Sequence, residues 1–224
     1  MDRTAWLAER RAAIVAAYDS EAPTYDENEY PSQMQRDWVT QLLRLMPPGG
    51  IVLDAPCGTG KYFPMVMAAG LRVTGVDQSA EMLSRARARG LAVSLEQGPL
   101  QGLRYDHEFD GVMTIDAMEN VPPEDWPVVL ASLHHAVRPG GLLYMTVEEM
   151  SESDIKHAFA ELSSRGAPAV LGEMVEGDVA GYHYYPGRER VLEWFDAEGL
   201  AVVEEGFNQE DGWGYRHFLL RDPA

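Results

Sequence analysis

The chain has little cysteine and little positive charge. Its 224 residues include one cysteine, Cys57, so no disulfide can form within the chain, and we expect the protein to reside in the reducing cytoplasm. Only 18 Lys and Arg side chains oppose 36 Asp and Glu side chains, which gives a formal net charge of −18. Because proteins that bind nucleic acids usually carry clustered basic residues, this charge disfavours a nucleic acid partner.

Long apolar runs are also absent. No stretch approaches the roughly 20 apolar residues of a membrane-spanning helix, and the first residues lack the apolar core of a secretion signal. We therefore expect neither a membrane partner nor secretion. There are two lysines, Lys61 and Lys156, so chemistry that depends on a lysine has few candidates.

The order of the hydrophobic segments predicts an α/β fold. After helical segments at 4–18 and 32–46, apolar segments of strand length alternate with helical ones, which favours a doubly wound, mostly parallel sheet with helices on both faces. Seven strands are predicted, over residues 51–54, 72–76, 91–95, 109–115, 142–147, 200–205 and 215–220. Further helices are predicted between residues 60 and 70 and over 79–90, 123–137, 151–165 and 188–198.

We expect one domain with four parts, because a chain of this length supports one sizeable core. Residues 1–46 form a helical N-terminal cap that acts as a lid, and residues 47–147 form a cofactor-binding core. Residues 148–187 form an insert on the substrate side, in which 166–187 is expected to be a loop. Residues 188–224 add a final helix and two strands.

The most informative segment is the glycine-rich turn after the first strand. Gly58-Thr59-Gly60 follows a buried strand closely, so the backbone can approach a ligand while the next helix points its N-terminus at it. Asp77 ends the second strand, where a carboxylate can accept hydrogen bonds from both hydroxyls of a ribose. A cofactor that contains a nucleoside is therefore predicted.

Two features favour S-adenosylmethionine over a dinucleotide. A dinucleotide-binding turn has a third glycine where this chain has Phe63. Asp54, before the turn, would face a pyrophosphate unfavourably, whereas it suits a zwitterionic amino acid group. An NAD(P)-dependent oxidoreductase is the alternative, although the chain has no Tyr-x-x-x-Lys pair to protonate a carbonyl.

The chain resembles the class I S-adenosylmethionine-dependent methyltransferases. Leu53–Gly60 resembles the first motif of that family, Val76-Asp77 its acid after strand 2, Phe109–Ile115 its strand-4 motif, and Leu133–Leu143 its entry to strand 5. The resemblance implies a Rossmann-like fold with S-adenosylmethionine as the cofactor. It also implies a set of cofactor-binding residues: Asp54, Ala55, Pro56, Gly58 and Gly60 in the turn, Asp77 at the ribose, Gln78, Met82 and Leu100 around the adenine, and Ile115 and Asp116 closing the pocket.

This sequence departs from the family pattern at two positions. Pro56 stands where the family commonly has a glycine. Pro99 stands where the family often has an acid that contacts the adenine amino group, and Gln97 or Gln101 is expected to substitute for it. The adenine contacts are therefore the least defined part of the predicted cofactor site.

The candidates for catalysis follow strands 4 and 5 or lie in the insert, because ligands of open α/β sheets bind outside the carboxyl ends of the strands. Glu119 is the first candidate for a general base, followed by His183 and Glu148. A solvent-exposed Glu119 and a structural His183 are the alternatives. Substrate contacts are expected from Tyr18, Tyr25, Asn120, Tyr182 and Tyr184, with ordinary packing as the alternative for the tyrosines.

No metal site is predicted from the histidines. His134 and His135 are adjacent in a predicted helix, so their side chains point about 100° apart and do not share one metal easily. The remaining candidates have no acid or histidine at a ligand spacing: His107, His157 and His217.

The expected function is methyl transfer to nitrogen or oxygen of a small-molecule acceptor, by a monomer or a homodimer. An amine-bearing acceptor is favoured because acids accumulate among the candidate site residues. These acids are Asp116, Glu119 and Glu148, joined by Glu173, Glu176 and Asp178 of the insert. A non-catalytic domain that binds S-adenosylmethionine and acts through partners is a further alternative.

Overall fold

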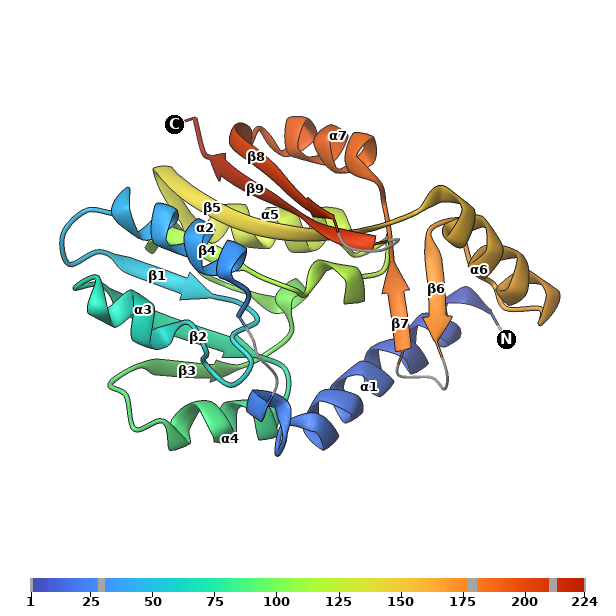
Figure 1. Ribbon diagram of the computed structural model, residues 1–224, viewed down its shortest axis with the longest axis horizontal. Coiled ribbons are helices and arrows are strands. Elements are labelled where there is room, and N and C mark those ends of the chain that lie inside the picture. The colour runs from blue at the N-terminus through green and yellow to red at the C-terminus, as the bar shows by residue number, and fades with distance from the viewer. Residues whose placement is uncertain (1, 28–30, 177–180, 210–212, 224) are drawn as a thin grey trace.

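The computed structural model describes residues 2–27, 31–176, 181–209 and 213–223, and Asp178 lies outside this part of the chain. A seven-stranded sheet in the order β3-β2-β1-β4-β5-β9-β8 forms its centre (Figure 1). The five strands from β3 to β5 are parallel, and β9 is antiparallel to both of its neighbours, which confirms the predicted fold class. The strands are β1 (Ile51–Asp54), β2 (Arg72–Asp77), β3 (Ser94–Gln97), β4 (Phe109–Thr114), β5 (Val137–Met150), β8 (Ala201–Gln209) and β9 (Trp213–Arg221).

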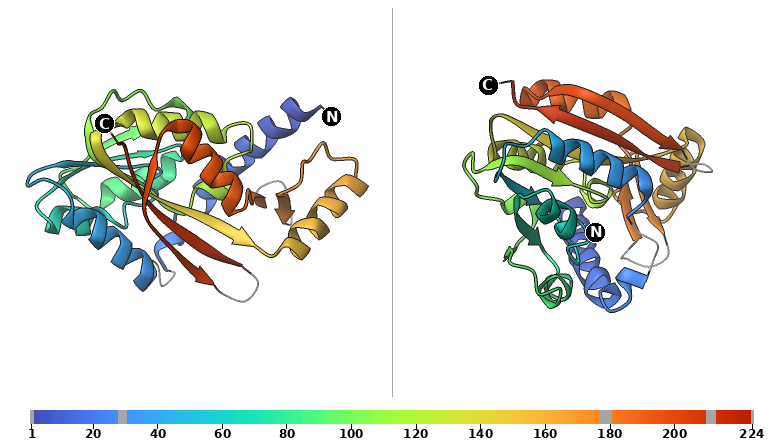
Figure 2. Two further views of the ribbon diagram at one scale, coloured as in Figure 1. Left: turned by 90° about the horizontal axis from the view of Figure 1, so that it is seen from above. Right: turned by 60° about the vertical axis from the view of Figure 1, so that its left-hand side comes forward.

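Helices cover both faces of the sheet, and each face has its own apolar cluster (Figure 2). One face packs against α2 (Gln33–Arg44), α3 (Phe63–Ala68) and α4 (Ala80–Ala88). The other face packs against α5 (Trp126–Ala136) and α7 (Arg188–Glu198). The remaining helical elements are α1 (Arg3–Glu21), α6 (Glu152–Ser164) and three short turns of 3₁₀-helix: η1 (Tyr25–Glu27), η2 (Leu100–Gly102) and η3 (Met118–Asn120). None of the helices in the described ranges combines the length and the apolar character needed to cross a bilayer.

Two strands begin three or more residues away from their predicted starts. β3 begins at Ser94, because residues 91–93 form a tight turn ahead of it. β5 begins at Val137, well before the predicted start, since Val137 pairs with Phe109 of β4. The register then shifts between Phe109 and Gly111, which accommodates the proline and glycines that suggested a later start.

The prediction of a loop over residues 166–187 is wrong, because this segment contains a β-hairpin (Figure 1). Its strands are β6 (Glu173–Glu176) and β7 (Gly181–Tyr184), and they form a separate two-stranded sheet. Each strand has four residues, and the Tyr182 and Tyr184 side chains of β7 are buried. Short strands with glycine nearby resemble a loop in composition, so the hairpin left no clear sequence signal.

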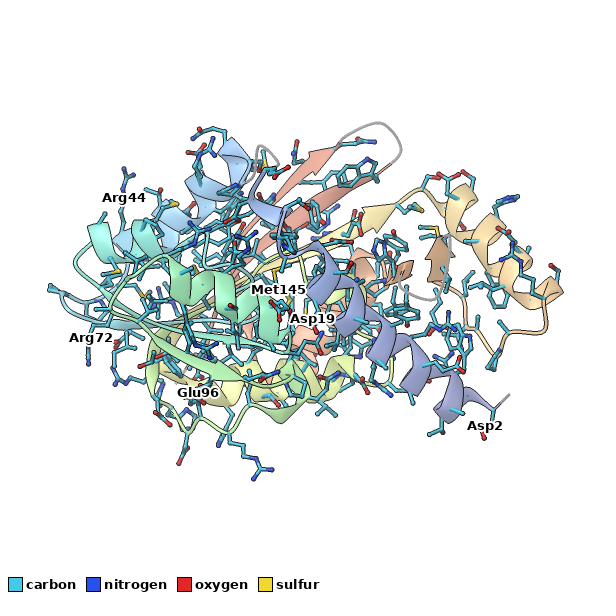
Figure 3. The ribbon with its side chains drawn as sticks, turned by 90° about the horizontal axis from the view of Figure 1, so that it is seen from below. Asp2, Asp19, Arg44, Arg72, Glu96 and Met145 are labelled. Carbon is cyan, nitrogen blue, oxygen red and sulfur yellow. The ribbon has the colours of Figure 1, made fainter. Side chains whose placement is uncertain are left out.

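The hairpin is joined to α1 by a buried ion pair. Glu173 is 0% exposed and accepts two hydrogen bonds of 2.8 Å from the guanidinium group of Arg3. The Tyr182 hydroxyl donates to the same carboxylate at 2.7 Å, and the Trp6 and Tyr182 rings meet edge to face. Figure 3 shows α1 running from Asp2 at the outer end to Asp19 near the middle of the molecule. We call α1 and the β6–β7 hairpin together the lid unit.

Loss of the charge on Glu173 should destabilise the lid unit. A Glu173→Gln substitution removes a charge-assisted acceptor while keeping the side-chain shape, so we expect the free energy of unfolding to fall by about 2 kcal/mol. Chemical denaturation monitored by circular dichroism measures this change. Glu152→Gln, which breaks an exposed pair with Lys156, is the matched control and should leave the midpoint unchanged. Equal effects of the two substitutions would contradict the structural role of Glu173.

Candidate functional site

The glycine-rich turn is held against the end of β2 by Asp77. One oxygen of this carboxylate accepts the Gly58 N–H and the other accepts the Ser79 N–H, each at 2.8 Å. Gly58 and Gly60 have positive φ values, and a Cβ on Gly60 would lie 2.5 Å from the Phe63 ring. The turn therefore requires glycine at both positions, and Asp77 fixes its backbone.

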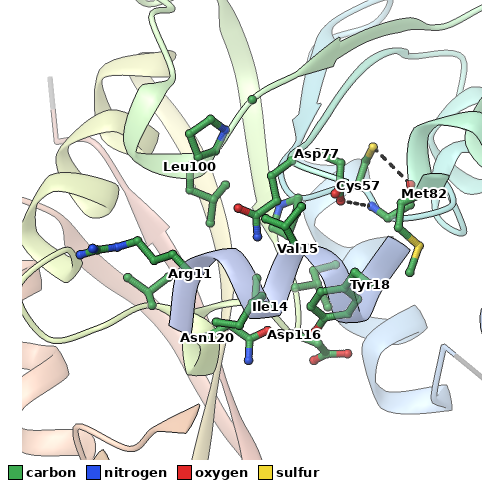
Figure 4. A pocket seen from close by; sticks show the side chains of 18 of the residues that line it. Arg11, Ile14, Val15, Tyr18, Cys57, Asp77, Met82, Leu100, Asp116 and Asn120 are labelled. Carbon is green, nitrogen blue, oxygen red and sulfur yellow. Dashed lines mark hydrogen bonds between the residues drawn. The ribbon is translucent and has the colours of Figure 1, made fainter. Parts of the chain in front are cut away.

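A cavity of about 630 Å³ opens beside this turn, at the carboxyl ends of the parallel strands (Figure 4). This volume lies in the range of small-molecule and cofactor sites. The cavity is lined by eight of the predicted cofactor residues: Pro56, Gly58, Asp77, Gln78, Met82, Leu100, Ile115 and Asp116. The other three, Asp54, Ala55 and Gly60, do not line it but lie in β1 and the turn that form its wall.

Asp54 has the features of a residue that binds a charged group. It is 1% exposed, and its Oδ2 atom has no hydrogen-bond partner among the described residues. Burial and the neighbouring charge of Asp77 raise the pKa of the Asp54 carboxyl well above its ordinary value. The ammonium group of an amino acid would supply both the missing donor and the missing charge.

One face of α1 forms a wall of the cavity, and of its residues the sequence predicted only Tyr18 as a site residue. Arg11, Ile14, Val15 and Tyr18 lie along this face (Figure 4). Their spacing of three or four residues matches one side of a helix, so the signal was present in the sequence. Arg11, Ile14 and Val15 were expected only to be part of a general lid, whereas Tyr18 was predicted to contact the substrate.

Asp125, a second residue missed from the sequence, lies at the same end of the cavity as Arg11. Its carboxylate accepts two hydrogen bonds from the Arg11 guanidinium group, at 2.8 and 2.9 Å, and one from the Gln101 side-chain amide at 2.9 Å. Of the two glutamines proposed to contact adenine, Gln101 lines the cavity, whereas Gln97 is exposed and donates to the Gln78 carbonyl. Asp125 thus places an acid near the position left open by Pro99.

Asp116, just after β4, is hydrogen-bonded to the first turn of α2. Its φ of +48° is a left-handed conformation that aspartate tolerates better than most residues. Its carboxylate accepts hydrogen bonds from the Thr146 hydroxyl and, at 2.7 Å, from the side-chain amide of Gln35, which also caps α2. Burial, together with the charge of Glu148, raises the pKa of Asp116 from 3.8 to about 7, although the bond from Thr146 opposes this shift.

The three predicted catalytic residues lie close to Asp116 but do not line the cavity. Glu119 is 5% exposed, so its predicted alternative as a solvent-exposed residue is wrong, and its Oε2 atom has no partner among the described residues. Burial raises the pKa of Glu119 well above its ordinary value, and the charges of Asp116 and Glu148 add to this effect. His183 Nδ1 lies 3.6 Å from Glu148 and 2.9 Å from the Tyr185 hydroxyl. We call Asp116, Glu119 and Glu148 the acidic cluster.

The predicted substrate residues fall into two groups. Tyr18, Tyr25 and Asn120 line the cavity, and the Tyr18 hydroxyl donates to the Asn120 side chain at 2.9 Å. Tyr182 and Tyr184 are buried in the hairpin and do not line the cavity, which favours the packing alternative for these two. The roles of all these residues stay predictions.

Comparisons with known proteins agree with the fold class. A sequence profile of the family described as "Methyltransferase domain" matches residues 52–141. The chain is 31% identical to the malonyl-[acyl-carrier protein] O-methyltransferase of Erwinia pyrifoliae over 162 residues, which cover 70% of this chain and 60% of that protein. It is 29% identical to the ubiquinone/menaquinone biosynthesis C-methyltransferase UbiE of Rubrivivax gelatinosus, covering 87% of this chain and 78% of that protein.

A solved structure also shares the fold. The 1,6-didemethyltoxoflavin-N1-methyltransferase of Burkholderia thailandensis, with bound 1,6-didemethyltoxoflavin and S-adenosylhomocysteine, superimposes with a TM-score of 0.71 at 18% identity. The match covers 94% of this chain and 88% of that chain. At this identity the likeness shows the fold alone.

The raised pKa of Asp116 predicts how stability depends on pH. Between its ordinary pKa of 3.8 and about 7, the folded state keeps a proton that the unfolded state has released. The stability that protonated Asp116 contributes is therefore present at low pH and lost as the pH rises through about 7. An Asp116→Asn substitution, which suits the positive φ, should reduce the fall in unfolding free energy between about pH 5.5 and about pH 8.

Denaturant titrations at the two pH values test this expectation. Asp196→Asn on the exposed side of α7 is the matched control and should keep the wild-type pH dependence. An unchanged pH dependence in Asp116→Asn would show that this carboxyl is ionised in the folded protein at both pH values.

Proposed function

Since the chain belongs to the class I S-adenosylmethionine-dependent methyltransferases, we propose that it transfers a methyl group to nitrogen or oxygen of a small-molecule acceptor. The family, the fold class and the family's cofactor agree with the sequence predictions. The observation that carries the proposal is the pair of buried acids, Asp54 and Asp77, on either side of the glycine turn at the cavity. The dinucleotide alternative has no support from the comparisons.

S-adenosylmethionine, when bound, supplies an electrophilic methyl group on a sulfonium centre. The residues of this chain fit it in two places. Asp54 offers a buried carboxylate, whose Oδ2 atom has no partner among the described residues, to the ammonium group of the methionine end. Each Asp77 oxygen accepts one backbone N–H and keeps a second lone pair for a ribose hydroxyl. Met82 and Leu100 add apolar surface for the adenine.

The acidic cluster supports an amine as the acceptor group. The charges that act on the pKa of Glu119 come from two other acids, and no lysine or arginine of the described residues is among them. Such a cluster is stabilised either by protons or by a cationic guest. A protonated amine would add positive charge beside Asp116 and Glu119. The relatives do not decide this point, because their names specify O-, C- and N-methylation.

Glu119 is the proposed proton acceptor. The acceptor ammonium would give a proton to the Glu119 carboxylate, and the nitrogen lone pair would then form the new N–C bond as the S–C bond breaks. Burial and the neighbouring charges of Asp116 and Glu148 raise the pKa of Glu119, which makes its carboxylate a stronger base. The contact from Tyr18 to Asn120 and that from Gln35 to Asp116 close the cavity on this side, so the acceptor would enter when they open.

Several expectations drawn from the sequence stay predictions. They are the four-part division at residues 46, 147 and 187, the cytosolic location, the absence of nucleic acid and membrane partners, and the monomeric or homodimeric state. Glu173 of the insert was counted among the acids that favour an amine-bearing acceptor. It is paired with Arg3, so it does not contribute charge to an acceptor.

Binding titrations test the cofactor site. We expect isothermal titration calorimetry to show that S-adenosylmethionine and S-adenosylhomocysteine bind and that Asp77→Ala weakens both about a hundredfold, since two charge-assisted hydrogen bonds of at least about 1.5 kcal/mol each are lost. Asp196→Ala is the matched control. Tight binding of NADH without a response to either adenosyl ligand would overturn the proposed function.

Matched acceptor pairs test the chemistry. The rate of S-adenosylhomocysteine formation is measured with benzylamine and with benzyl alcohol. Larger acceptor pairs, in which an amine replaces a hydroxyl group, are compared in the same way. We expect the amines to be favoured, and Glu119→Gln to lower kcat by about 10²- to 10⁴-fold with unchanged cofactor affinity. Turnover of the alcohols alone would contradict the amine. Cofactor binding without turnover of any pair would favour the non-catalytic alternative.

The Glu119→Gln variant also tests whether the acidic cluster interacts with the cofactor or with the acceptor. If the cluster served the sulfonium charge of the cofactor, Glu119→Gln would weaken S-adenosylmethionine but not the neutral S-adenosylhomocysteine. Equal affinity of the variant for both ligands, together with lost turnover, assigns the cluster to the acceptor.

A further inference from the structure

Three potential metal ligands meet at the end of the sheet opposite to the cavity. Asp106 and His107 lie just before β4, and His135 lies in the last turn of α5. The cavity lies at the carboxyl ends of the strands, so these residues, at the amino end of β4, belong to a different part of the molecule. His134 takes no part, because its ring contacts Glu198 and Asp222.

The backbone holds the two histidines together. The His107 N–H donates to the His135 carbonyl at 2.8 Å, and the next N–H, of Glu108, donates to the Ala136 carbonyl at 3.1 Å. His107 has a φ of +53°, an uncommon conformation for a residue with a side chain. The two backbone bonds keep it there, and this conformation places the His107 ring 4.9 Å from that of His135.

The ligand atoms are close to the separation that a tetrahedral metal requires. His135 Nε2 lies 3.4 Å and His107 Nε2 lies 3.9 Å from the same oxygen of Asp106. The three ligand atoms all lie within 4.8 Å of one another. Ligands on a tetrahedral zinc with bonds of about 2.1 Å stand roughly 3.4 Å apart. Small side-chain rotations would therefore complete the geometry.

The His107 ring also has the outer contact that metal-binding histidines use. Its Nδ1 atom lies 2.6 Å from the Val137 carbonyl, which can only accept, so Nδ1 carries the hydrogen. In the neutral ring the lone pair is then on Nε2, the atom that points toward Asp106. A backbone carbonyl that fixes the tautomer and the orientation of a ligand histidine is a usual feature of zinc sites.

We propose that Asp106, His107 and His135 form a binding site for a divalent transition metal of the Zn²⁺ type, with water in the fourth position. Two imidazoles and one carboxylate suit this class of metal and not Mg²⁺ or Ca²⁺, which prefer oxygen ligands. The three side chains are 79%, 42% and 60% exposed, so a metal reaches them without any opening of the fold. The bound metal joins the end of α5 to the segment before β4.

Metal titration of the full chain tests the site. The protein is prepared without a histidine tag, treated with a chelator and titrated with ZnCl₂ by calorimetry and with CoCl₂ by visible absorption. We expect one Zn²⁺ per chain, Co²⁺ bands typical of tetrahedral coordination, and a higher thermal unfolding midpoint with Zn²⁺. His135→Ala and His107→Asn, the latter compatible with a positive φ, should each weaken binding at least about tenfold.

Two further variants make the outcome decisive. His157→Ala removes a histidine from α6, away from the site, and should leave binding unchanged. Asp106→Asn should weaken binding as the histidine variants do, and if it does not, the metal is held by two histidines alone and the three-ligand site is wrong. No saturable Zn²⁺ binding to the wild type, or binding that survives His135→Ala, would also overturn the proposal.

Discussion

The carboxylate of Asp77 accepts one N–H from the glycine turn and another from the first residues beyond β2, and much of the molecule is arranged around these two bonds. They fix the turn in a conformation that only glycine adopts easily at two positions. The fixed turn shapes one wall of the cavity, and α1 provides a facing wall. Because the side chain that holds the turn is also the one proposed to bind the ribose, a change at Asp77 would alter the proposed site and its scaffold together.

The sequence predicts the elements whose ends are marked by strong local signals. β1 and α7 have the predicted bounds, since a proline-glycine segment precedes β1 and glycines flank α7. The fold class was predictable because alternating strands and helices form parallel sheets. The β6–β7 hairpin was not, because its short strands are held by Glu173 and its contact with Arg3, which lies 170 residues away in the chain.

In the candidate site, too, residues close together in the sequence were predicted, whereas residues brought together only by the fold were not. The residues of the turn and of β2 were identified because they are contiguous or follow a fixed spacing. Asp125 and the cavity face of α1 join the site only through the fold. The pairing of His107 with His135 depends on a backbone hydrogen bond between segments 28 residues apart, and no local pattern reports such a contact. The burial of Glu119 likewise follows from packing and not from its neighbours in sequence.

The lid unit has a consequence for how acceptor preference can diversify among proteins with this architecture. Its two parts come from distant stretches of the chain, and they are joined by the ion pair between Arg3 and the fully buried Glu173 and by the contact of the Trp6 and Tyr182 rings. A transplanted hairpin that lacks this acid would leave Arg3 with only its more exposed pair with Glu124, whereas a transplanted α1 that lacks Arg3 would leave Glu173 buried without its ion-pair partner. Recombination of such chains would therefore preserve folding best when the hairpin and the first turn of α1 are inherited together, so the two segments are expected to behave as one exchangeable module.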